Sequence, residues 1–361
     1  MNFSDFSYRN FFSLSWLFFF AIVLSFIGDR IHLPIPWLLI PLMVAIIWAL
    51  RKEENKILPK SFSIIGQAII AIFTASRFSF ETLITAQDYF LPLLICIGVT
   101  ASFSLVNGYL IYKFADIDFP SSFLGCIPGA GPSLVAMSED LGADAIAVTV
   151  LQYLRILMVS VIIPIIATFY LTESSSIPVK IIAENRHLLP SLPIPINLTI
   201  IALCAFIGVQ MGKIVKLPSN LFLAPFFSCL LLFSFFPYEI SLPVSIFRGG
   251  LLLLGLSIGV KFEIHAFQKL LKAVLLEIGL IILLIVVCII SGYWFHLVTK
   301  IDTLTALLGS TPGGISTMMA TVIELGGNSG FVLTMQMTRM LLILTLTPFV
   351  ANSVINKKEI S

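Results

Sequence analysis

Long apolar stretches dominate the sequence, and several are long enough to cross a lipid bilayer as a helix. A helix that spans the bilayer needs about 20 consecutive, mostly apolar residues. In lipid the backbone must satisfy its own hydrogen bonds, which a helix does within one segment. The stretches lack the alternating pattern of barrel strands, so they predict an all-α protein. They cover residues 11–28, 35–50, 89–112, 145–170, 196–209, 221–236, 251–260 and 274–295.

Composition also indicates a polytopic membrane protein. Apolar residues make up 58% of the chain and charged residues 11%, whereas soluble proteins contain about 45–50% and about 25%. The net charge of +2 is too small to indicate nucleic-acid binding. The expected partner is the lipid bilayer. The first stretch could be a secretory signal peptide because Arg9 precedes it. No small-x-small cleavage site follows, so we expect a mature helix.

The chain also contains an internal repeat. When it is compared with itself at the offset that places Gly28 on Gly212, scarce residue types coincide without a gap. We therefore expect two tandem membrane repeats, residues 1–180 and 181–361. The matching pairs are Gly28/Gly212, Pro34/Pro218, Pro41/Pro225, Gly66/Gly250, Phe78/Phe262, Gly125/Gly309, Pro128/Pro312, Gly129/Gly313, Gly142/Gly326, Gln152/Gln336, Arg155/Arg339 and Pro164/Pro348.

The basic residues are compatible with two topologies. Lys and Arg clusters are expected on the cytoplasmic side of a membrane. If the polar segments 119–144 and 302–328 re-enter without crossing, the halves are inverted and both termini are cytoplasmic. If both segments cross, each half has six spans and the halves are parallel. We favour inversion, with about ten spanning helices. The reason is that parallel halves would export the cluster Lys261, Lys269 and Lys272.

The same two polar segments carry the residues that we expect to form a site. Proline stops an incoming helix and glycine permits positive φ, so Pro-Gly runs predict helix breaks at membrane depth. The half-helix after a break presents free N–H groups and a partial positive charge, which suit an anion. The alternative is a kink that only permits close packing. The candidate substrate-binding residues are Pro128, Gly129, Gly131, Ser133, Pro312, Gly313, Gly314, Ser316 and Thr317.

Two intramembrane arginines extend the candidate site. Arg155 and Arg339 lie well inside apolar stretches, where charged residues are costly and usually functional. Gln152 and Gln336 precede them by three residues and share their helix faces. We count all four among the substrate-binding candidates.

Carboxylates after the breaks could pair with these arginines. Asp140 and Glu324 are matched by the repeat and are candidates for ion coupling. An Arg–carboxylate pair could be a structural link, an anion clamp or a proton-coupled switch. Glu277 has no counterpart in the first half, and we expect it at the membrane interface.

Cysteines and histidines are dispersed rather than clustered. None of the five cysteines or four histidines has the spacing of a metal or redox site. We therefore expect no cofactor, no metal site and no catalytic residue.

At these motifs the sequence resembles the AbrB family of bacterial membrane proteins, known for a tandem AbrB duplication domain. The resemblance spans nearly the whole chain. It rests on Leu-Pro-x-Pro-Trp-Leu-Leu-x-Pro at 33–41, Pro-Gly-Gly-x-Ser at 312–316, Glu-x-Gly at 324–326 and Gln-x-x-Arg at 336–339. The first half departs from this pattern because Ala130 replaces the second glycine of the Pro-Gly-Gly run. That departure puts a shared role for both breaks in question.

The resemblance implies a membrane function but carries conflicting labels, ammonia monooxygenase and regulator of gene expression. The family is also similar to cation–proton antiporter and anion-transporter folds, which use inverted repeats and broken helices. We therefore expect a secondary transporter of a small, anionic solute in the bacterial inner membrane, compatible with a homo-oligomer. The alternatives are a membrane-embedded sensor or regulator that acts through a partner, and an ammonia-monooxygenase-like enzyme. The enzyme would need clustered metal ligands.

Reporter fusions within residues 261–272 separate the two topologies. Inverted halves place this basic segment in the cytoplasm. A fusion there should then give activity from a cytoplasmic reporter and none from a periplasmic one. The opposite pattern would require six crossings in each half.

Overall fold

The computed structural model describes residues 8–31, 33, 35–50, 58–78, 88–128, 134–135, 137–138, 142–171, 193–214, 220–235, 243–262 and 264–358. Within these ranges the chain is helical and has no strand, which confirms the all-α prediction. The helices are α1 (Tyr8–Arg30), α2 (Pro36–Leu50), α3 (Lys60–Arg77), α5 (Phe90–Phe114), α6 (Phe119–Cys126), α8 (Ala145–Leu171), α10 (Ile194–Ile214), α11 (Asn220–Phe235), α12 (Val244–Gly259), α13 (Ile264–Lys269), α14 (Leu271–Thr299), α15 (Thr303–Ser310), α16 (Ile315–Leu325) and α17 (Ser329–Lys358).

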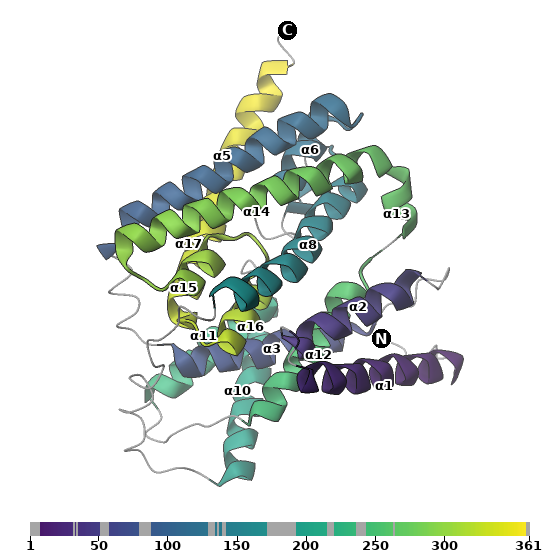
Figure 1. Cartoon of the computed structure of the whole chain (residues 1–361), viewed down its shortest axis with the longest axis vertical. Coiled ribbons are helices and arrows are strands. Elements are labelled where there is room, and N and C mark those ends of the chain that lie inside the picture. Colours follow the sequence, from purple (N-terminus) through teal and green to yellow (C-terminus); the bar gives the residue numbers. More distant parts are fainter. Residues whose placement is uncertain are drawn as a thin grey trace.

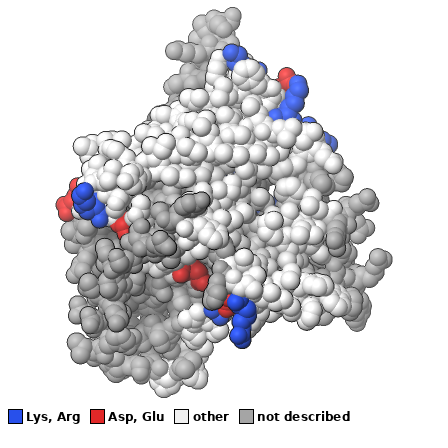
Figure 2. Space-filling view, viewed as in Figure 1, with Lys and Arg blue, Asp and Glu red and all other residues white. Residues whose placement is uncertain are grey.

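Each apolar stretch of the sequence coincides with a helix. Three helices, α5, α8 and α14, are long and apolar enough to cross a membrane. Large apolar side chains such as Leu91, Phe169 and Ile290 are exposed on them. Charged side chains on the face shown in Figure 2 form a few small, separate groups and leave a broad uncharged area. These features fit association with a membrane, whereas the count of about ten spans stays a prediction.

The helices form two groups (Figure 1). The lower group contains α1, α2, α3, α10, α11 and α12, and the upper group contains α5, α6, α8, α13, α14, α15, α16 and α17. Helices far apart in sequence pair within the lower group, where α12 packs on α2 and α11 packs on α3. The two groups meet mainly where α3 passes α16 and α17. The broken segments therefore lie next to the boundary between the groups.

Glycines let α12 and α2 approach each other closely in the lower group. A Cβ atom on Gly255 would lie 2.4 Å from the carbonyl oxygen of Leu38. A Cβ on Gly259 would lie 2.4 Å from the carbonyl oxygen of Leu42. Small residues at such crossings bring backbones into van der Waals contact, which drives helix association where lipid weakens the hydrophobic effect.

Glycines have the same role in the upper group, where α5 and α14 lie side by side (Figure 1). A Cβ on Gly108 of α5 would lie 3.2 Å from Cα of Phe123 in α6. A Cβ on Gly292 of α14 would lie 3.1 Å from Cα of Leu307 in α15. The sequence repeat places Gly108 on Gly292 and Phe123 on Leu307, so it also relates these two backbone contacts.

We predict that Gly255→Ala destabilises the protein and that Gly249→Ala on the same helix does not. The added methyl at 255 meets the α2 backbone, and overpacking of this kind costs about 1–3 kcal/mol. A Cβ on Gly249 meets nothing within 4 Å, so helix propensity leaves that variant unchanged or slightly more stable. Thermal unfolding of both variants in detergent measures the difference. Equal midpoints would contradict close packing of α12 on α2.

Candidate functional site

The second polar segment contains the helix break that the sequence predicts. Asp302 caps α15, because its Oδ1 accepts the Thr305 N–H at 2.8 Å, and the helix ends at Ser310. Residues 311–314 are not helical, and α16 begins immediately after Gly314. Gly314 has a φ of 85°, which glycine adopts without a Cβ clash. The chain is thus interrupted inside the upper group.

The first polar segment begins in the same way. Asp118 caps α6, because its Oδ2 accepts the Ser121 N–H at 2.9 Å, and the helix ends at Cys126. Pro128 follows as a buried, non-helical residue. Four other candidates, Gly129, Gly131, Ser133 and Asp140, lie outside the described residues. Their roles stay predictions.

Two buried glutamines bind the carbonyl groups at the ends of α6 and α15. The Gln152 Nε2 of α8 donates to the carbonyls of Leu124 at 2.7 Å and Ile127 at 2.9 Å. The Gln336 Nε2 of α17 donates to the carbonyls of Leu308 and Thr311 at the same distances. Without these donors, buried helix-end carbonyls would lack partners.

The two arginines complete this arrangement. Arg155 donates from Nη1 to the Cys126 carbonyl at 2.8 Å and from Nη2 to Gln152 Oε1 at 2.7 Å. Arg339 donates from Nη1 to the Ser310 carbonyl at 3.1 Å and from Nη2 to the Gln336 Oε1. The exposed fractions are 2% for Arg155 and 6% for Arg339. Each guanidinium therefore binds the end of a helix.

The helix ends do not satisfy every donor of Arg155. The buried Nε of Arg155 has no hydrogen-bond partner within the described part of the chain. Helices α6 and α15, whose ends the arginines bind, both pack against α8. Cys126 links Glu277 to Arg155, because its carbonyl accepts from Arg155 and its thiol donates to Glu277. The Cys288 carbonyl of α14 accepts from the Ser310 hydroxyl beside Arg339. The two chain halves thus share one buried, charged centre.

Glu277 is buried in the protein, which the sequence did not predict, and its depth relative to the membrane interface stays a prediction. Its side chain is 1% exposed and faces the end of α6, where the Cys126 Sγ donates to Oε2 at 3.7 Å. The sequence signal was an acidic residue inside a 29-residue apolar helix. The repeat obscured this signal because the position has no acidic counterpart in the first half.

The remaining candidates lie around the second break. Pro312, Gly313 and Thr317 are buried, and Glu324 is half-buried in the last turn of α16. The Ser316 Oγ donates to Gln67 Oε1 of α3 at 3.4 Å. Gln67 was not predicted as a site residue, although it is the one amide side chain in α3 and could have indicated a polar contact. This contact joins the broken segment to the lower group.

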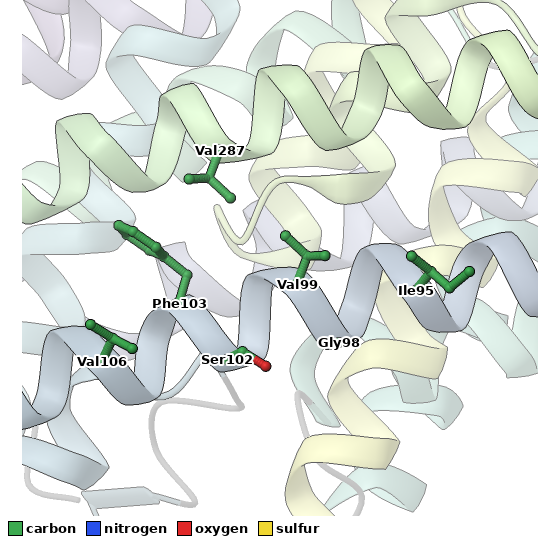
Figure 3. Close-up of a pocket in the computed structure, with 7 residues that line it drawn as sticks. All are labelled: Ile95, Gly98, Val99, Ser102, Phe103, Val106 and Val287. Atoms are coloured by element: carbon green, nitrogen blue, oxygen red, sulfur yellow. The ribbon is translucent and has the colours of Figure 1, made fainter.

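A surface depression away from these arginines is lined mainly by apolar residues. It is an open depression of about 600 Å³ over α5 and α14, lined by seven residues of which Ser102 alone has a polar side chain (Figure 3). Its lining includes Gly98, Val99 and Phe103 of α5 and Val287 of α14. Among the described residues, no three His, Cys, Asp or Glu side chains lie together as metal ligands.

Comparisons with known proteins give one family. The family model described as "Transition state regulatory protein AbrB" matches residues 37–354. The chain is 28% identical over 333 residues to "Putative regulator AbrB" of Escherichia coli (strain K12), covering 92% of this chain and 93% of the relative. It is 22% identical over 341 residues to "Uncharacterized protein YhjN" of Bacillus subtilis (strain 168), covering 90% and 88%. No solved structure matches the chain significantly.

We predict that Gln336→Leu destabilises the protein strongly. The change leaves the Leu308 and Thr311 carbonyls and one Arg339 N–H without their partner, at about 1–3 kcal/mol for each buried group. Thr345→Val is the control, because the Thr345 hydroxyl is exposed and bonds only within α17; its effect should stay within about 0.5 kcal/mol. Thermal unfolding compares the two. An unchanged unfolding midpoint in Gln336→Leu would show that the end of α15 needs no side-chain donor.

Proposed function

The chain belongs to the AbrB family, and from this premise we propose that it is a multi-pass secondary transporter of a small anion in the bacterial inner membrane. The observation that carries the proposal is the pair of buried arginines at the ends of interrupted helices. Buried charge in such a protein is costly and is usually retained for ion or substrate pathways.

The charge balance of this centre favours an anionic ligand. Among the described residues two guanidinium groups, Arg155 and Arg339, and one carboxylate, Glu277, are buried. An anion at this centre would balance the excess positive charge and would find an N–H donor in the Arg155 Nε, which has no partner among the described residues. The first amide groups of α16, which begins at Ile315, add the positive end of a helix dipole.

Contacts made by residues that the repeat matches support two membrane repeats. Gln152 and Gln336 each bind two helix-end carbonyls, and Arg155 and Arg339 each bind a third. We propose that the repeats are inverted, with about ten spans and both termini in the cytoplasm.

Alternating access would move the upper group against the lower one. The described side-chain hydrogen bond between the groups, from Ser316 to Gln67, is long for an O–H···O bond at 3.4 Å. A weak link of this kind can break and re-form during such a movement. The break at 311–314 would carry the bound anion with the upper group.

A regulatory role is the second candidate, because the family description and the E. coli relative both carry regulator names. In that case the same centre would bind its anion without transporting it. A thermal-shift screen with lactate, succinate, glutamate, phosphate and sulfate identifies binding, since a ligand at 100 times its Kd stabilises a protein by about 2.7 kcal/mol. Uptake into vesicles then separates the candidates: binding without uptake favours the regulator.

We predict that at least one of Arg155→Gln and Arg339→Gln lowers uptake of the stabilising anion, measured below saturation, by about ten-fold or more while the protein still inserts in the membrane. A lost charge-assisted hydrogen bond of about 1.5–3 kcal/mol lowers affinity by about ten-fold to a hundred-fold. Arg248→Gln is the control, because Arg248 pairs with Asp29 at 3.2 Å in the lower group and should keep uptake. Normal uptake in both site variants would remove the arginines from the anion site.

A further inference from the structure

We propose that Glu277 carries the coupling proton, so that the protein moves its anion together with H⁺. This inference rests on the proposed transport function and names its coupling ion and the residue that binds it. The proton adds to the Glu277 carboxylate when an anion occupies the arginine centre and leaves when the anion departs. For a monovalent anion, one negative charge and one proton move together, so the step is electrically neutral.

The position of Glu277 is unusual for an acidic residue. It lies in the second turn of α14, the most apolar of the three helices that are long enough to cross a membrane, and its side chain is buried between α14 and the end of α6. Lys272, five residues earlier on the same helix, is exposed and pairs with Asp116 at 2.7 Å. Asp116 therefore balances the charge of Lys272, and Glu277 takes no part in that pair.

The partners of Glu277 leave both of its protonation states accessible. Its described hydrogen bond comes from a thiol, the Cys126 Sγ at 3.7 Å, and a thiol is a weak donor. Arg155 attracts the carboxylate but directs its two Nη groups to Cys126 and Gln152 oxygens. The carboxylate therefore depends on the charge of Arg155 without being tied to it by a bidentate bond.

Anion binding and proton binding are linked through Arg155. When the centre is empty, the guanidinium charge stabilises ionised Glu277. When an anion neutralises that charge, the buried carboxylate loses its compensation and takes up a proton. Cys126 on α6 and Arg155 on α8 are the titratable or charged groups that act on Glu277 within the described residues.

Glu277 has no acidic counterpart in the first half, although the Gln–Arg pairs are matched by the repeat. The repeat that places Gly28 on Gly212 also places Leu93 on Glu277 and Cys126 on Ser310. Leu93 is fully buried in α5, so an apolar side chain fits this kind of position. One buried acid among the described residues, Glu277, predicts one proton for each transport cycle.

The first test is infrared difference spectroscopy of the protein in phosphatidylethanolamine–phosphatidylglycerol vesicles, without added anion. Above about pH 6 water-exposed carboxyl groups are ionised, so a carboxylic acid carbonyl band there reports a buried acid. The wild type should gain this band on acidification towards pH 6, and Glu277→Gln should lose it. Asp116→Asn, which removes an exposed carboxylate, should keep it. A band that persists in Glu277→Gln would overturn the proposal.

The second test measures uptake of the panel anion that the wild type transports. An inward proton gradient should accelerate uptake by the wild type. Glu277→Gln and Glu277→Leu should still exchange internal for external anion but lose the acceleration by the gradient, and uptake of a monovalent anion should become sensitive to membrane potential. The leucine variant reproduces the Leu93 position and should fold if glutamine does not.

The outcomes separate the two proposals. A Glu277 band without transport of any panel anion would keep the proton site and reject the transporter. Transport whose proton dependence survives in both Glu277 variants would keep the transporter and reject Glu277 as the coupling group.

Discussion

The end of an interrupted helix is the constraint on which this structure depends. A helix that stops inside a protein leaves carbonyl groups without partners, and lipid offers no water to replace them. Gln152 and Arg155 supply the donors for α6, and Gln336 and Arg339 supply them for α15. Each break therefore requires a polar face on the following long helix, and that requirement brings two positive charges into the interior.

Those charges have consequences beyond the helix ends. Two buried cations need negative charge nearby, and the described chain supplies one buried carboxylate at Glu277. In the proposed mechanism a solute anion supplies the second negative charge. The same interactions that hold the breaks would then select the ligand and link it to a proton, because each change of charge alters the cost of the neighbouring one.

Much of this arrangement could be predicted from particular residues. Apolar stretches predicted α5, α8 and α14, the three helices long enough to cross a membrane, and Pro312-Gly313-Gly314 predicted the break between α15 and α16. Those signals are local, because backbone hydrogen bonding and Pro or Gly geometry depend on neighbouring residues. The role of Gln67 and the burial of Glu277 were not predicted because both depend on contacts with distant parts of the chain, at Ser316 and Cys126.

The sequence by itself determined helix content, the break at 312–314, AbrB family membership and the pairing of Gln with Arg three residues apart on one helix face. Helix period and residue chemistry suffice for these. Only the tertiary structure decided that the arginines bind helix-end carbonyls, that Glu277 is buried beside Cys126, and that Gln67 meets Ser316. These features arise where distant helices cross, and a linear pattern does not contain the orientation of one helix against another.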